Sequence, residues 1–143
     1  MEVLQLSVFL ENAAGRLADV AEALASGGVN VRALALADMA EFGILRLVVD
    51  DTARGRQVLK DAGFTVGTTP VIAVGIPDSP GGMAQVLRAL GARGLPVEYM
   101  YAFARQHGWD AVLIMRVEDQ AGALAALRER EVRVLEPHEV HGS

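Results

Sequence analysis

The stretch Leu10 to Leu17, with the sequence LENAAGRL, joins two segments of different periodicity. From Val3 to Leu10 most apolar side chains alternate with others, which predicts a β-strand. From Leu17 to Leu24 apolar residues recur at helical spacing. We therefore expect a strand-to-helix turn in which Asn12 caps the helix. Free backbone N–H groups near Gly15 to Leu17 would converge at the positive end of the helix dipole, where a small carboxylate can bind.

A second stretch, Ile76 to Met83 with the sequence IPDSPGGM, repeats this arrangement. It links another apolar run to another helical stripe. Asp78 stands where Asn12 stands in the first loop, and Gly81 and Gly82 follow it. Helix capping and turn geometry alone are a simpler interpretation of both loops, and that interpretation stays open beside ligand binding.

The whole order of elements also repeats along the chain. Strand, helix, strand, strand, helix, strand is predicted over residues 1–69 and again over 70–143, with Pro70 separating the last strand of one from the first strand of the other. This is the order of the ferredoxin-like fold. We predict an α+β chain with two ferredoxin-like βαββαβ repeats, antiparallel sheets and helices on one face. Glu131 occupies the place that Gly63 has in the first repeat, and it is strained if the chain turns left-handed there.

Three further features complete the expected fold. Asp51 or Thr52, and later Asp119, are predicted to cap the second helix of each repeat. Third strands such as Ile44 to Val49 are apolar on both sides. A partner sheet covering the second face, in a homodimer, explains this pattern, although a central strand with a few exposed apolar residues also does. The polar tail after Leu135 is expected to fray at its end.

Composition bounds the function. The 143 residues suit one medium domain or two small ones, and 52% of them are hydrophobic, enough for a sizeable core. No window predicts a membrane span, and the first residues lack the features of a signal peptide. Cysteine is absent, which excludes disulfides, thiolate catalysis and zinc–thiolate sites. The net charge of −5 and scattered basic residues argue against nucleic-acid binding. A cytoplasmic protein is expected.

Two tandem repeats of this order, each with a glycine turn after the first strand, resemble the ACT domain family. The resemblance rests on Glu11 to Leu17 and Gly28 to Val31 in the first repeat, and on Asp78 to Met83 and Gly94 to Val97 in the second. ACT domains are regulatory amino-acid-binding modules found in enzymes such as aspartokinase and phosphoglycerate dehydrogenase. The resemblance implies side-by-side pairing of the domains. It also implies a ligand between the first loop of one domain and the second-strand start of another.

The resemblance also suggests which residues bind the ligand. In the serine-sensing members two asparagines hold it, and the matching positions here are Asn12 and Asn30. A histidine that accompanies them is Leu10 in this chain, which suggests a less polar ligand, an apolar or aromatic amino acid. The first repeat is expected to hold the better site. The candidate ligand-binding residues are Asn12, Ala14, Gly15, Arg16, Leu17, Asn30, Val31, Asp78, Gly81 and Gly82.

The sequence offers little evidence for a catalytic site, a metal site or a cofactor. His138, Glu139 and His141 lie close together in the tail, but their spacing is not that of a known zinc motif and a surface role is favoured. We therefore expect a stand-alone regulatory protein that binds a small amino acid and acts allosterically on a partner enzyme or on its own assembly. Two alternatives remain: a ligand-free module for oligomerisation or partner docking, and a small enzyme that binds an acid substrate at the loop.

Overall fold

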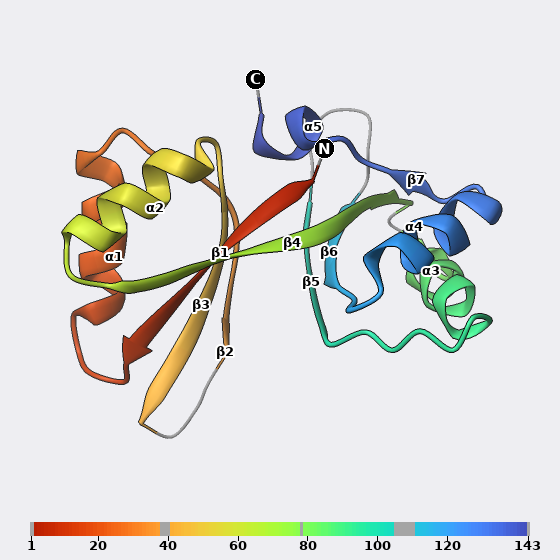
Figure 1. Cartoon of the computed structure of the whole chain (residues 1–143), viewed down its shortest axis with the longest axis horizontal. Coiled ribbons are helices and arrows are strands. Elements are labelled where there is room, and N and C mark those ends of the chain that lie inside the picture. Colours follow the sequence, from red (N-terminus) through yellow and green to blue (C-terminus); the bar gives the residue numbers. More distant parts are fainter. Residues whose placement is uncertain (1, 38–40, 78, 105–110, 143) are drawn as a thin grey trace. The chain divides into compact units, whose positions relative to one another are not determined.

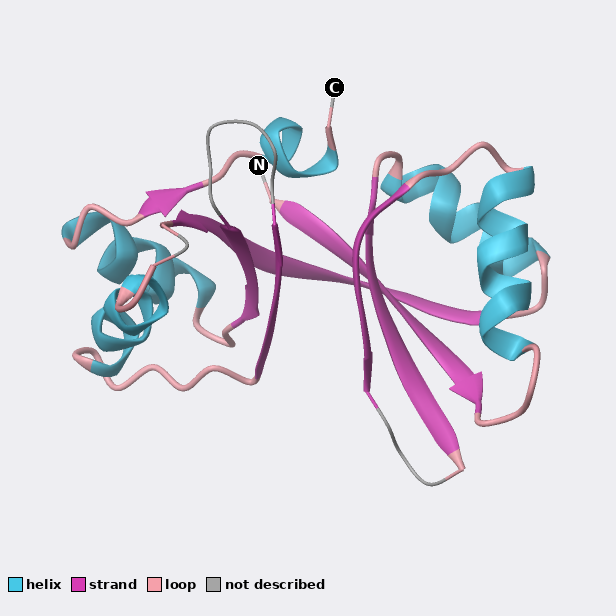
Figure 2. Ribbon diagram, turned by 180° about the vertical axis from the view of Figure 1, so that it is seen from behind, coloured by secondary structure: helices cyan, strands magenta, loops and turns pink. Residues whose placement is uncertain are grey.

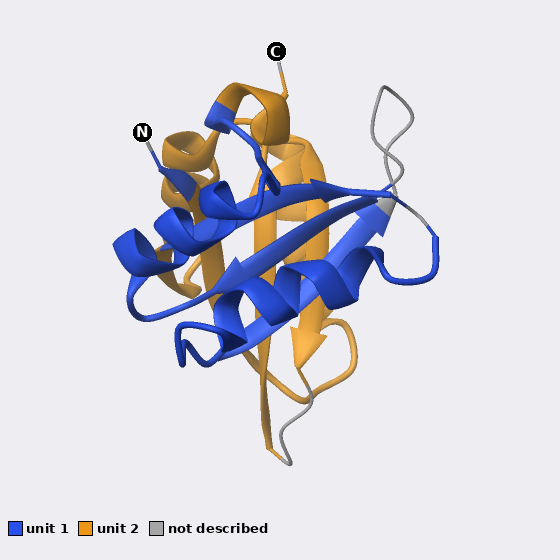
Figure 3. Ribbon diagram, turned by 90° about the vertical axis from the view of Figure 1, so that its right-hand side faces the viewer, with its two compact units in different colours: residues 1–3, 70–137 blue, residues 4–69, 138–143 orange. Residues whose placement is uncertain are grey.

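The structure is a computed structural model, and it describes residues 2–37, 41–77, 79–104 and 111–142. The chain divides into two compact units, shown in Figure 3. Unit 1 comprises residues 1–3 and 70–137, and unit 2 comprises residues 4–69 and 138–143. Unit 2 thus contains most of the first predicted repeat, and unit 1 most of the second. The assignment of residues 1–69 and 70–143 to two repeats stays a prediction.

Unit 2 is built around the antiparallel strands β1, β3 and β2. Its elements are β1 (Val3–Glu11), α1 (Arg16–Ser26), β2 (Val31–Ala37), β3 (Phe42–Val49), α2 (Thr52–Asp61) and the start of β4 (Thr65–Ile76). β3 lies between β2 and β1, and β4 follows β1 in the strand order. Both helices cover one face of these strands (Figures 1 and 2). This is the predicted ferredoxin-like arrangement.

The core of unit 2 lies between the helices and this face of the sheet. Leu6 and Leu47 are directly opposite each other in the β1/β3 register, and both are almost completely buried. Helix α1 contributes Val20 and Leu24, which recur at helical spacing. The predicted periodicity therefore identifies the buried face of both element types.

The opposite face of this sheet differs along its length. Gln5 and Val48 point away from the helices and are fully buried, with 0% of their surface exposed, in the single chain. Phe9 and Phe42, farther along the same face, are each 52% exposed. These two residues mark an open apolar part of the face, and the expected cover by a partner sheet stays a prediction.

Unit 1 repeats the plan. Its elements are the end of β4, α3 (Gly82–Gly91), β5 (Tyr99–Ala104), β6 (Ala111–Arg116), α4 (Gln120–Glu129) and β7 (Arg133–Val134). The strand order is β7-β4-β6-β5, all antiparallel. Its core centres on Met115 of β6, Leu90 of α3 and Leu127 of α4. The predicted caps are confirmed in both units: Asp51 accepts a hydrogen bond from the Arg54 N–H, and Asp119 accepts one from the Gly122 N–H.

The chain path differs from expectation at two places. Pro70 does not separate two strands, because β4 runs unbroken from Thr65 to Ile76. Proline suits an extended strand where no ladder donor is required, and the pairing of β4 with β6 begins only at Ile72. The tail is also more regular than its polar sequence predicts: residues Pro137–His141 form a short helix, α5, which buries Val140, while Ser143 at the end that was expected to fray lies outside the described residues.

Glu131 has a φ of 59°, and Gly63, at the matching place in unit 2, has a φ of 93°. Both residues adopt the left-handed backbone conformation, which costs a residue with a Cβ about 1 kcal/mol relative to glycine. We predict that Glu131→Gly raises the free energy of unfolding by about 0.5–1 kcal/mol, measured by urea denaturation. Gly63→Ala is the matched control and should lower it by a similar amount, since no atom crowds a Cβ there. If Glu131→Gly instead lowers the free energy of unfolding, the proposed backbone strain at Glu131 is contradicted.

Candidate functional site

The loop between β1 and α1 has a geometry set by Gly15. Gly15 adopts a φ of 88° and is the residue from which α1 begins, with no side chain capping the helix. The backbone N–H of Asn12 donates to the Glu41 carbonyl at 2.8 Å, which fixes the loop to the chain just before β3. The prediction that Asn12 caps α1 is therefore wrong, because the left-handed glycine starts the helix three residues later. The Arg16 N–H, one of the expected anion donors, donates to the Ala13 carbonyl at 3.3 Å.

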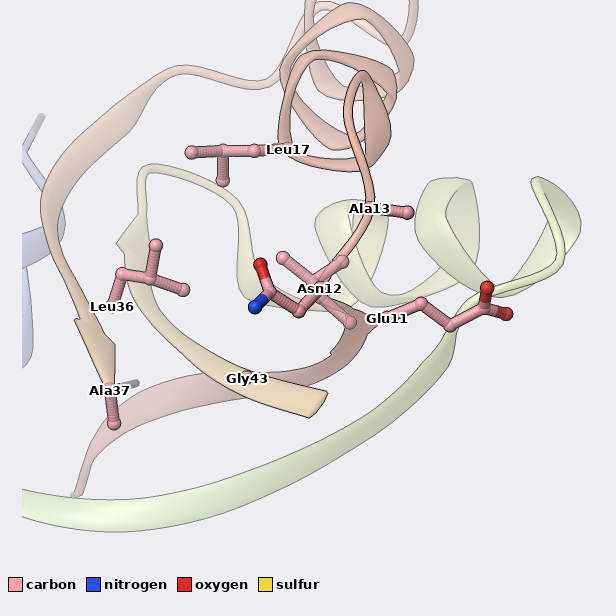
Figure 4. A pocket seen from close by; sticks show the side chains of 8 residues that line it. Glu11, Asn12, Ala13, Leu17, Leu36, Ala37 and Gly43 are labelled. Carbon is pink, nitrogen blue, oxygen red and sulfur yellow. The ribbon is translucent and has the colours of Figure 1, made fainter. Parts of the chain in front are cut away.

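A pocket of about 270 Å³ lies beside this loop (Figure 4). Its walls come from the end of β1, the loop, the first turn of α1, the end of β2 and the start of β3. The lining residues are Leu10, Glu11, Asn12, Ala13, Leu17, Leu36, Ala37 and Gly43. In Figure 4 the Asn12 amide and the side chains of Leu17 and Leu36 border the same space, whereas the Glu11 carboxylate points away from them.

Strand register brings these residues together. Leu10 of β1 lies opposite Gly43 of β3, and Leu36 of β2 lies opposite Leu45. Because Gly43 carries no side chain, the space beside Leu10 remains open. A Cβ at Gly43 would come within 3.2 Å of the Ala37 carbonyl oxygen, so this glycine also permits close packing of the strand ends.

The pocket combines apolar walls with one neutral amide. Leu17 is 47% exposed and Leu36 is 52% exposed, although both are large apolar residues. Leu10 is instead buried in the core and forms the floor. Exposed apolar side chains around a concavity are typical of a ligand or partner site. The arrangement can hold a small molecule with an apolar group and a polar end that hydrogen-bonds to an amide.

The structure places only part of the predicted first-repeat set in this pocket. Asn12 and Leu17 line it, whereas Ala14, Gly15 and Arg16 belong to the same loop and helix start without lining it. Arg16 is engaged elsewhere: its guanidinium pairs with Asp19 at 3.2 Å and lies 4.6 Å from the centre of the Phe64 ring. Its observed contacts are therefore structural.

Asn30 and Val31 lie at the other end of β2. Val31 pairs with Val49, and the pocket lies at Leu36 and Ala37, at the end of the same strand. At about 3.3 Å per residue, this separation is roughly 20 Å. The backbone N–H of Asn30 donates to the Asp50 carboxylate at 2.9 Å. A role in binding a ligand at the loop of another repeat or chain, which the resemblance implies, stays a prediction.

The second loop is described in part. Asp78 lies outside the described residues. Gly81 has a φ of 95° and begins α3 as Gly15 begins α1. Position 82 has room only for glycine, because a Cβ there would come within 2.4 Å of the Pro77 carbonyl oxygen. A shallow groove in unit 1 is bordered by Arg88 and Arg130 and lies over α3 and the end of α4, away from this loop.

Several pocket residues were not predicted. Leu10, Glu11 and Ala13 belong to the predicted loop but were not among the candidate ligand-binding residues, while Leu36, Ala37 and Gly43 come from neighbouring strands. Pairing the predicted strands in ferredoxin-like order places the ends of the second and first strands on either side of the third, and this is the signal that could have found them. Among the described residues, no three side chains of metal-binding types gather as a site. No helix in that part of the chain is long and apolar enough to span a membrane.

Solved structures that match this chain include both near and distant relatives. The crystal structure of protein BT0572 from Bacteroides thetaiotaomicron has 38% sequence identity and a TM-score of 0.93, and the match covers 100% of this chain and 98% of that one. The ligand-free regulatory subunit of aspartate kinase from Thermus thermophilus has 17% identity and a TM-score of 0.64, over 91% of this chain and 93% of that one. The corresponding subunit from Thermus flavus has 19% identity and a TM-score of 0.60, over 92% and 94%.

A search of curated proteins gave no match. The two aspartate kinase subunits have identities that support a shared fold and nothing finer. A family model described as an ACT domain pair matches residues 1–140, nearly the whole chain. This agrees with the two βαββαβ units and with the left-handed glycine that begins the first helix of each. The chain therefore belongs to the ACT domain pair family.

Proposed function

We propose that this chain is a regulatory protein without catalytic activity of its own, and that it binds a small amino acid with an apolar or aromatic side chain. The observation that carries the proposal is the pocket beside the first loop, where the Asn12 amide meets the exposed side chains of Leu17 and Leu36. An amino acid of this class has an apolar side chain and a charged end, which match the two kinds of residue in the pocket. Its apolar group would cover the two leucines, and its charged end would lie toward the amide and the start of α1.

The start of α1 favours the carboxylate end of such a ligand. The first turn of any helix presents N–H groups without intrahelical partners, and the helix dipole adds a partial positive charge there. Leu17 is in this turn and also lines the pocket. A carboxylate bound beside it would be stabilised by the helix, while the side chain of the same ligand packs on Leu36.

A partner enzyme is the second part of the proposal. Two structural neighbours are named as regulatory subunits of aspartate kinase, each similar in extent to this chain. We propose by analogy that ligand binding here changes the activity of a separate enzyme in amino-acid metabolism, in the cytoplasm.

A homodimer would provide the rest of the site. Leu34 on edge strand β2 and Phe9 on the open part of the sheet face are large and exposed. Burying such residues against a second copy removes apolar area from water. The same residues favour the second candidate function, a docking or oligomerisation module without a ligand.

The ligand proposal predicts a thermal shift. At least one apolar or aromatic amino acid should raise the melting temperature of the full chain, because a ligand that binds only the folded state stabilises it. Asn12→Ala should weaken the binding of that amino acid about 10- to 100-fold, measured by calorimetry, because a hydrogen bond to a charged ligand is lost. The backbone bond from Asn12 to Glu41 does not depend on the side chain, so the loop should persist.

Two variants make this test specific. Gln57→Ala is the matched control, because it removes an exposed amide on α2 that does not line the pocket, and it should bind as the parent does. Asn30→Ala should weaken binding only if a second repeat or chain completes the site. If none of the twenty amino acids shifts the melting temperature, the docking function replaces ligand binding.

The dimer proposal predicts a mass of about twice the 15.2 kDa chain in sedimentation at micromolar concentration. Leu34→Arg should dissociate the dimer if the β2 edge is the contact, and Phe9→Arg should do so if the sheet face is. Both side chains are largely exposed in the single chain, so neither change should unfold it. A monodisperse monomer of the parent protein would contradict the proposal.

A further inference from the structure

The C-terminal helix α5 makes several polar contacts with strands of unit 2 and buries one of its own side chains. That side chain is Val140, which is 3% exposed. The Arg32 side chain of β2 reaches the tail, and its Nε–H donates to the His141 carbonyl at 2.9 Å. Gly142 follows with a φ of 89°, and a Cβ there would overlap the same guanidinium. The tail is therefore fitted closely to the start of β2.

The His141 ring joins two further strands. Its Nδ1 lies 2.7 Å from the Val49 carbonyl oxygen at the end of β3. The Leu4 N–H, near the start of β1, donates to its Nε2 at 3.4 Å. A carbonyl oxygen can only accept and a backbone N–H can only donate, so Nδ1 must carry the proton and Nε2 must have a free lone pair. Both contacts together require the neutral ring.

The position of the ring in the sheet explains what these contacts do. The β1/β3 pairing extends as far as Leu6 opposite Leu47, and Leu4 and Val49 lie two residues beyond that pair on their strands. At this end of the ladder the imidazole stands between the two strands and satisfies the backbone N–H of one and the carbonyl of the other. His141 therefore closes the end of the sheet opposite to the pocket.

Protonation would disrupt this arrangement. A proton on Nε2 would point an N–H at the Leu4 N–H, so that two donors face each other. It would also add positive charge near Arg32, the basic side chain that contacts the tail. The carboxylate next to Val49, that of Asp50, already accepts from the backbone N–H groups of Asn30 and Asp51.

Helix α5 itself carries two further titratable residues, His138 and Glu139. His138 is exposed, and Glu139 is partly buried with an interaction of its own. Neither side chain bridges β1 and β3. The two contacts that the ring makes with the backbone of these strands therefore depend on the charge state of His141.

We propose that α5 is a releasable clasp, which closes the end of the unit 2 sheet while His141 is neutral and leaves it when His141 is protonated. Residues 138–143 belong to unit 2 although Pro137 belongs to unit 1, and Leu4 is the first residue of unit 2 after Val3 of unit 1. The contact between Leu4 and His141 therefore joins the two segments of unit 2 close to where each of them begins. Release of the clasp frees the tail together with Val140.

The test compares the full chain at about pH 8 and pH 5, the range in which histidine changes charge. Heteronuclear NOE measurements on the amides of Val140 and Gly142 should give an ordered tail at pH 8 and a mobile one at pH 5. His141→Ala should leave the tail mobile at both values. At pH 8 it should also speed hydrogen exchange of the Leu4 amide roughly 3- to 10-fold, the effect of losing one net hydrogen bond.

Two substitutions separate the clasp from a general acid effect. His141→Gln cannot titrate in this range and should abolish the pH response of the tail. His138→Gln changes the exposed neighbouring histidine and should leave that response as in the parent protein. A parent tail that stays equally ordered at both values, or a response that is lost in His138→Gln and kept in His141→Gln, would overturn the proposal. Neither result depends on whether an amino acid binds the pocket.

Discussion

The pairing of β3 with β1 and β2 is the constraint on which the described features of unit 2 depend. It places Leu6 against Leu47 in the core and Leu10 against Gly43 at the pocket. At the other end, beyond the last pair of this register, the Leu4 N–H and the Val49 carbonyl both contact the His141 ring. A slip of one residue would turn every side chain of a strand to the opposite face. Core, pocket and clasp would then be lost together.

Local pattern was sufficient to predict the order of elements from β1 to β7, except that it divided β4 into two strands at Pro70. Alternation in β1 and helical spacing in α1 identified both segments, and the carboxylates of Asp51 and Asp119 capped the expected helices. The failures have local causes as well. Asn12 was expected to cap α1, but Gly15 can adopt a left-handed conformation that begins the helix without a side-chain cap. The tail formed a short helix that buries Val140, which no local pattern reveals.

Only the part of the candidate site that lies in the β1–α1 loop and the first turn of α1 could be predicted from the sequence. Asn12 and Leu17 lie in the loop that drew attention first, and both line the pocket. Leu36, Ala37 and Gly43 reach it through strand pairing, so their contribution depends on register rather than on any motif. Asn30 shows the converse case. Its motif is apparent in the sequence, yet within unit 2 it lies at the far end of β2 from the pocket.

The two loops indicate that a motif alone does not make a site. Gly15 and Gly81 have nearly the same φ, 88° and 95°, and each begins a helix without a side-chain cap. The first loop becomes part of a pocket because Gly43 leaves space beside Leu10 and because Leu36 stands exposed at the end of an edge strand. These residues have no counterpart in the loop sequence itself. Ligand selectivity in a tandem protein of this kind can therefore diverge between repeats through strand-end substitutions, while the helix-starting glycine, which the backbone requires, remains in both.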